Sequence, residues 1–177
     1  MKHVPEAIGG GLAMAAVSTL GDYVWATWIP SPRVSFGLAH GVLVFLCVGA
    51  YLGAVAGQTA KGAMAGPIVG LLAAASYYAL APVLGRSAMF AAWIALWVAL
   101  GLVNARLRRQ PGGIRDALIR SSVAAISSGI AFYLISGIWF PFDPQGWDYA
   151  VHFASWTFAY LPAFLALLVE PKNRSMH

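Results

Sequence analysis

The chain has 177 residues, of which 60% are hydrophobic and only 10% are charged, whereas about a quarter of the residues in an ordinary soluble domain are charged. This composition excludes a disordered chain and a soluble cytosolic protein, and it indicates an integral membrane protein. The net charge of +5 does not by itself indicate a nucleic-acid partner, because in a membrane protein the placement of basic residues matters more than their sum.

Six apolar runs follow one another along the chain, separated by short segments that contain Pro, Gly or charged residues. A helix needs about 20 residues to span a bilayer, and at these lengths only helices satisfy their own backbone groups in lipid. We therefore predict an all-α, polytopic membrane protein, a six-transmembrane-helix bundle that forms a single domain over residues 1–177. The predicted spans cover residues 8–28, 34–56, 62–84, 88–107, 114–139 and 147–169.

The basic residues are unevenly distributed between the two sides of these spans. Arg33 and Arg86 fall on one side, and the other nine of the 11 Lys and Arg residues fall on the side that holds both termini. These nine are Lys2, Lys61, Arg106, Arg108, Arg109, Arg115, Arg120, Lys172 and Arg174. Because cytoplasmic loops carry an excess of Lys and Arg, this distribution predicts that both termini are cytoplasmic.

Glycines recur every four residues late in the second span and early in the third. The two rows are Gly49, Gly53 and Gly57 in the second span and Gly62, Gly66 and Gly70 in the third. Small residues at this spacing let two helices approach closely, which stabilises helix pairs in lipid. We therefore expect the two rows to touch. Gly11, Ala15 and Thr19 form a similar row in the first span.

Four ionisable residues lie in the half of the predicted bundle away from the termini. They are Asp22 in the first span, His40 in the second, and Asp148 and His152 on one face of the sixth. A charged group in a span is costly unless it is paired or wetted, so it usually faces the bundle interior or a water-filled cavity. We expect Asp22, His40 and His152 to approach one another and to border a cavity.

Three interpretations of this cluster stay open at this point: a structural hydrogen bond from Asp22 to a histidine or backbone group, a polar patch that touches a ligand headgroup, and a metal site. The metal interpretation is the weakest, because the single Asp-x-x-x-His pair has neither a His-rich helix nor a Cys pair beside it. No metal and no cofactor are therefore predicted. The predicted ligand-binding residues are Asp22, Trp25, His40, Asp148, His152 and Trp156.

Motifs of hydrolases, zinc proteases, nucleotide-binding proteins and thiol oxidoreductases are missing from the sequence, and its only two Glu residues, Glu6 and Glu170, lie near the ends of the chain. We therefore expect that the protein is not an enzyme. The basic stretch from Arg106 to Arg120 is short and contains no aromatic residue, so no nucleic-acid partner is expected.

The order of features resembles the insulin-induced gene (Insig) family in its prokaryotic form. The first span ends in Thr19-Leu-Gly-Asp22, the link Ile29-Pro-Ser-Pro32 leads to a Gly-rich second span, and the basic stretch Arg106-Leu-Arg-Arg109 joins the fourth and fifth spans. The resemblance implies a six-helix protein of the bacterial inner membrane with a central cavity that is open to the bilayer and holds a lipid. Animal members bind sterols within the helical bundle and retain partner membrane proteins, and they are not enzymes. A sterol- or diacylglycerol-like ligand, a role as a lipid sensor and a membrane-protein partner or homo-oligomer are therefore expected.

Two other classes of protein fit the same features. The substrate-binding subunit of an energy-coupling-factor vitamin transporter is also six-helical, and Gly11, Ala15 and Thr19 could dock its transmembrane partner. Such a subunit binds a water-soluble vitamin from the outside, where Asp22, His40 and His152 are expected. The third class is an accessory subunit of a larger membrane complex. A copurified ligand distinguishes the first two classes, because one retains a lipid and the other a vitamin.

Overall fold

A computed structural model describes residues 3–29, 34–85, 87–110, 112–138 and 144–170, without the side chains of residues 135–138. Its six helices are long and apolar enough to cross a membrane, which confirms the predicted all-α bundle and an integral, multi-pass membrane protein. The helices are α1 (Val4–Trp28), α2 (Val34–Val55), α3 (Thr59–Leu84), α4 (Ser87–Arg108), α5 (Gly113–Ile138) and α6 (Asp148–Leu168).

The boundaries agree closely with the predicted spans. The largest differences are the starts of α1 and α3, at Val4 and Thr59, where segments that contain a charged residue, Glu6 or Lys61, continue the helix beyond the apolar run. Trp139, the predicted end of the fifth span, lies outside the described residues, as do Arg33 and Arg86.

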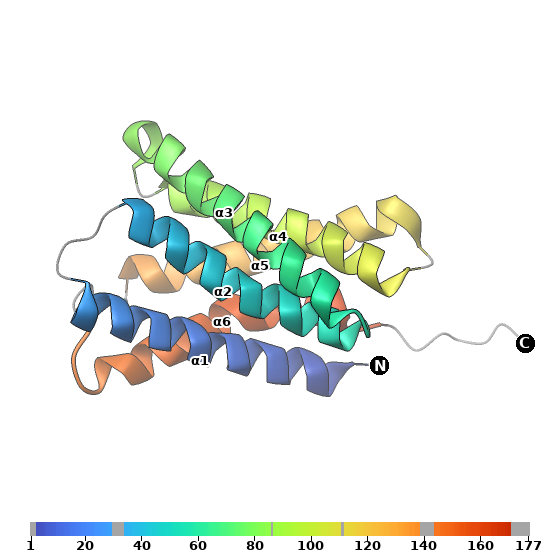
Figure 1. Cartoon of the computed structure of the whole chain (residues 1–177), viewed down its shortest axis with the longest axis horizontal. Coiled ribbons are helices and arrows are strands. Elements are labelled where there is room, and N and C mark those ends of the chain that lie inside the picture. The colour runs from blue at the N-terminus through green and yellow to red at the C-terminus, as the bar shows by residue number, and fades with distance from the viewer. Residues whose placement is uncertain (1–2, 30–33, 86, 111, 139–143, 171–177) are drawn as a thin grey trace, which may run out of the picture.

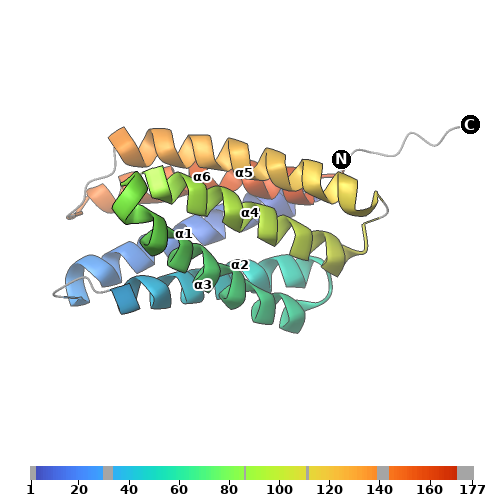
Figure 2. The same cartoon turned by 90° about the horizontal axis from the view of Figure 1, so that it is seen from above.

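The helices are arranged in a ring in which each one packs beside its neighbours in the chain and α6 packs against α1. Figures 1 and 2 show this arrangement, with the start of α1 and the end of α6 at the same end of the bundle. The contacts between neighbours are unequal. The contact between α2 and α3 is the most extensive, the contact between α1 and α6 is the next, and α1 touches α2 only sparsely.

Close packing of glycines explains the extensive contact between α2 and α3. A Cβ atom built on Gly62 would overlap the backbone of Gly49 and Gly53, and one built on Gly66 would overlap the carbonyl oxygen of Phe45. Backbones can approach this closely only where side chains are missing, so the predicted contact between the two glycine rows is confirmed.

One member of the predicted rows has a different role. Gly57 has φ +68° and nothing lies within 4 Å of the position of its Cβ, so the expectation that it belongs to the packed row was wrong. A left-handed backbone is readily adopted only by glycine, and Gly57 provides it in the turn between α2 and α3. Gly41 instead extends the row on α2, because a Cβ there would lie 3.1 Å from the carbonyl oxygen of Gly70.

The end of the bundle that holds the start of α1 and the end of α6 also holds every Lys and Arg among the described residues, and we call it the basic end. These residues are Lys61, Arg106, Arg108, Arg109, Arg115 and Arg120. At the opposite end, which we call the cavity end, the described residues carry only acidic charges, on Asp22 and Asp148.

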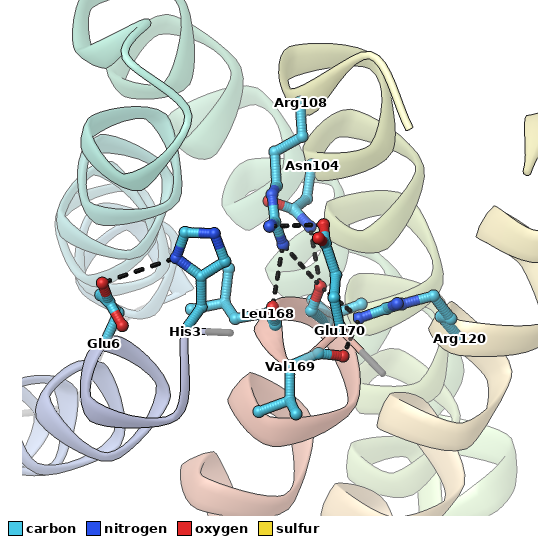
Figure 3. Close-up of polar contacts among 9 residues, drawn as sticks. His3, Glu6, Asn104, Arg108, Arg120, Leu168, Val169 and Glu170 are labelled. Atoms are coloured by element: carbon cyan, nitrogen blue, oxygen red, sulfur yellow. Dashed lines mark hydrogen bonds and ion pairs between the residues drawn. The ribbon is translucent and has the colours of Figure 1, made fainter. Parts of the chain in front are cut away.

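Two arginines at the basic end bind the C-terminal end of α6, as Figure 3 shows. Arg108 of α4 donates to the carbonyl oxygens of Leu167 and Leu168 at 3.3 and 3.1 Å, and it pairs with the Glu170 carboxylate at 2.7 Å. Arg120 of α5 donates to the carbonyl oxygens of Leu167 and Val169 at 3.0 and 2.7 Å. The last carbonyls of a helix have no partner within that helix, and here α4 and α5 provide partners.

Candidate functional site

A central cavity of about 750 Å³ lies in the half of the bundle nearest the cavity end. All six helices contribute to its walls, so the cavity belongs to the bundle as a whole. Its lining includes Ser18, Asp22 and Trp25 of α1, Gly37, His40, Gly41, Val44 and Phe45 of α2, Gly70, Ala73, Ala74, Tyr77 and Tyr78 of α3, Met89, Ala92, Trp93 and Leu96 of α4, Phe132, Tyr133 and Leu134 of α5, and His152, Trp156 and Tyr160 of α6.

The polar corner of this cavity is built on the carboxylate of Asp22. Asp22 Oδ2 accepts a hydrogen bond from Trp156 Nε1 at 2.6 Å and lies 2.8 Å from His152 Nδ1. The His152 side chain is 3% exposed and the Asp22 side chain is 18% exposed, so the imidazole is enclosed while the carboxylate also reaches the cavity. In this geometry Nδ1–H of His152 is the donor, because a carboxylate oxygen accepts.

A second polar contact joins the same two helices one turn further into the bundle. Ser18 Oγ lies 2.9 Å from Tyr160 Oη, and both side chains are buried. Ser18 and Asp22 are four residues apart on α1, as are Trp156 and Tyr160 on α6, so each pair occupies one helical face. One face of α1 is therefore matched to one face of α6 over two turns.

His40 of α2 packs against α1 at the residue next to Asp22. A Cβ atom built on Gly21 would meet His40 Cε1 at 2.5 Å, so the imidazole packs directly against the α1 backbone beside Asp22. The ring of Trp25 meets the His40 ring edge to face, with centroids 6.2 Å apart. Glycine at position 21 makes room for this approach. Asp22, His40 and His152 thus line one cavity, as the sequence predicted.

Stacked aromatic rings form the wall next to the polar corner. Phe132 stacks on Trp93 with centroids 4.6 Å apart and on Trp156 with centroids 5.1 Å apart. Trp93 is held in place by donating to Ser128 Oγ at 2.8 Å, and Ser128 in turn donates to the carbonyl oxygen of Ala159. These hydrogen bonds fix the orientation of the wall from the side away from the cavity.

Of the six residues predicted to bind a ligand, five line the cavity: Asp22, Trp25, His40, His152 and Trp156. Asp148 does not line it. It is the first residue of α6, and its Oδ2 accepts a hydrogen bond from the backbone amide of Gln145 at 3.0 Å. Asp148 and His152 do lie on one helical face, but Asp148 is one turn nearer the start of α6 and lies outside the cavity lining. We therefore do not expect Asp148 to contact a ligand in the cavity.

Sequence reasoning missed several residues of the site. Ser18 and Tyr160 were not identified, although their spacing of four residues from Asp22 and Trp156 is the signal that would have found them. The aromatic wall residues Trp93 and Phe132 carry no such signal, because aromatic residues occur throughout this apolar chain.

A metal site has no support in the geometry. The residues that the structure describes contain no group of three or more His, Cys, Asp or Glu placed to hold an ion. Of the interpretations left open by the sequence, the hydrogen bond between Asp22 and a histidine is present, and the same carboxylate also borders the cavity.

We compared the chain with protein-family models, curated proteins and solved structures, and none of them matches. The cavity and the groups that line it are therefore the features that bear on function.

Proposed function

We propose that the protein is a non-enzymatic membrane protein that binds a lipid-like ligand, of the size of a sterol or a diacylglycerol, in the central cavity. The observation that carries this proposal is a cavity of about 750 Å³ between six membrane-spanning helices, with mostly apolar and aromatic walls and a polar corner. Small-molecule sites typically have volumes of about 300–1,000 Å³ and place a few polar groups in an apolar lining.

The polar corner suggests how such a ligand would be oriented. Asp22 accepts hydrogen bonds, so a hydroxyl or an ammonium group of the ligand would donate to its carboxylate. The apolar body of the ligand would then lie against the walls formed by Val44, Leu96 and Phe132. Buried polar groups are costly unless they are hydrogen-bonded, which favours a ligand whose one polar group faces Asp22.

The resemblance of the sequence to the Insig family supports the same class of ligand. We propose a prokaryotic-type member of that family that acts as a lipid sensor, with its effect passed to a membrane-protein partner or to a second copy of the chain. The ring arrangement suits this role, because a ligand in the cavity touches every helix at once.

The basic end is proposed to face the cytoplasm of a bacterial cell, with the cavity end on the outer side of the inner membrane. The positive-inside rule supports this orientation. In a Cys47→Ser background, a single cysteine placed at Gln145 should react with a membrane-impermeant maleimide on intact cells, whereas one placed at Gln110 should not. Labelling at Gln110 together with protection at Gln145 would show that the protein has the opposite orientation in the membrane.

A cavity-filling variant tests the binding proposal. Ala92 of α4 is 5% exposed and lines the cavity, whereas Ala95 on the same helix is exposed on the outside of the bundle. The Ala92→Phe protein should retain roughly a tenth or less of the lipid that copurifies with the wild type, and Ala95→Phe should retain all of it. The measurement is mass spectrometry of small molecules released from protein purified in a mild detergent.

The same measurement distinguishes the competing classes. A retained water-soluble vitamin that is lost in Ala92→Phe would favour the transporter subunit. Equal retention of lipid by wild type, Ala92→Phe and Ala95→Phe would show that the lipid coats the outside of the bundle, and the proposal would then be wrong.

A further inference from the structure

The polar corner contains one carboxylate, Asp22, whose partner for an ion pair among the described residues is a histidine, His152, rather than a Lys or Arg. Asp22 is the only Asp or Glu among the described lining residues, and these contain no Lys and no Arg. With His40 and His152 counted as neutral, this lining has a formal charge of −1. Buried charges in proteins are usually paired, because an unpaired charge in a medium of low polarity is costly.

One oxygen of this carboxylate is available to a ligand. Both described hydrogen bonds of Asp22 are made by Oδ2, and no described residue donates to Oδ1. The donor nitrogens of Trp156 and His152 hold the carboxylate in a fixed position, since both come from α6 and lie one helical turn apart. The site therefore offers a preorganised negative group at the edge of a hydrophobic chamber.

Aromatic rings surround this negative group. Nine of the described lining residues are Trp, Tyr or Phe, and Trp156, which binds the carboxylate directly, stacks with Phe132 at 5.1 Å between centroids. The faces of aromatic rings attract cations, and cages of such rings recognise quaternary ammonium groups. A carboxylate together with aromatic faces is complementary to a positive charge on an apolar molecule.

We infer that the cavity selects lipophilic organic cations, such as an amphipathic amine or a quaternary ammonium, over neutral and anionic molecules of the same size. A cation gains attraction from Asp22 and from the rings, a neutral ligand gains at most one hydrogen bond, and an anion meets a like charge. This inference rests on the proposed function, because it assigns the ligand class of the same cavity.

Two probes of matched shape and opposite charge test the inference. Tetraphenylphosphonium and tetraphenylborate each carry four phenyl groups on a central atom, so they differ mainly in the sign of their charge. Binding to the purified full-length protein in a nonionic detergent is measured by titration calorimetry, with the Ala92→Phe protein as the background for uptake outside the cavity. The wild type should bind tetraphenylphosphonium above this background and should not bind tetraphenylborate.

A charge-removing variant gives the second readout. Asp22→Asn keeps an oxygen that can accept from His152 and Trp156 while it removes the charge, and it should weaken tetraphenylphosphonium binding by about tenfold or more. The matched control Asp148→Asn removes a carboxylate at the same end of the bundle but outside the cavity lining, and it should bind like the wild type.

The outcomes separate this inference from the proposed function. Equal binding of the two probes, or Asp22→Asn with unchanged affinity for tetraphenylphosphonium, would overturn the charge selectivity, while loss of lipid in Ala92→Phe would still support a lipid-binding cavity. Cation binding that persists in Ala92→Phe would place the probe outside the cavity and would overturn the inference. If Asp22→Asn does not fold, the charge selectivity is tested by comparing the binding of the two probes to the wild type.

Discussion

Replacement of Asp22 by alanine is expected to lower the free energy of unfolding by about 3 kcal/mol, because it leaves the buried donors of His152 and Trp156 without their shared acceptor. Asp22→Asn should cost only about 1 kcal/mol, since the amide oxygen can still accept from His152 and Trp156, although as a neutral acceptor it forms weaker bonds. Thermal unfolding in detergent, followed by circular dichroism, measures both changes.

The control for this prediction is Asp148→Ala. The Asp148 carboxylate accepts from a single backbone amide near the start of α6, so its removal should cost less than about 1 kcal/mol. An Asp22→Ala protein that melts like the wild type but no longer retains its ligand would show that the carboxylate serves the ligand alone. That result would contradict a structural role for the bond to His152.

Loss of either arginine that binds the end of α6 is expected to lower the free energy of unfolding by a comparable amount. Arg120→Met removes donors to the carbonyl oxygens of Leu167 and Val169, and Arg108→Met removes donors to Leu167, Leu168 and Glu170. Each change should lower the free energy of unfolding by about 2 kcal/mol, since hydrogen bonds from charged donors are the stronger ones.

The double variant gives a sharper test of this cluster. Because both arginines donate to the carbonyl oxygen of Leu167, their effects should not be additive, and a double-mutant cycle should return a coupling of about 0.5 kcal/mol or more. Arg115→Met is the matched control. It removes the same charge from α5, but Arg115 is exposed. If Arg120→Met and Arg115→Met unfold alike, the contacts at the end of α6 do not stabilise the bundle.

The sequence predicted the fold well because lipid imposes strong rules on helix length and on charge. The need to satisfy every backbone group in lipid identified the spans, and the cost of an isolated carboxylate placed Asp22 toward the interior near His152. The glycine rows predicted the contact of α2 with α3, with the exception of Gly57, whose place in a turn depends on its backbone conformation rather than on spacing.

The site was less predictable for a physical reason. In a helix that is apolar on every face, the hydrophobic pattern does not reveal which face points inward, so the stacking of Phe132 on Trp93 could not be derived. For Asp148, helical spacing gave the correct face but not the depth, because the start of α6 fixes how far the side chain lies from the cavity.

The unequal contacts around the ring also bear on how the chain assembles during synthesis. The hairpin of α2 and α3 can form as soon as both helices have been made, because its contact is local and very close. By contrast, α1 meets its main partner only when α6 has been made, after the four helices between them. Asp22 can therefore bind Trp156 and His152 only after α6 has been made, and the cavity is completed later than the contact between α2 and α3.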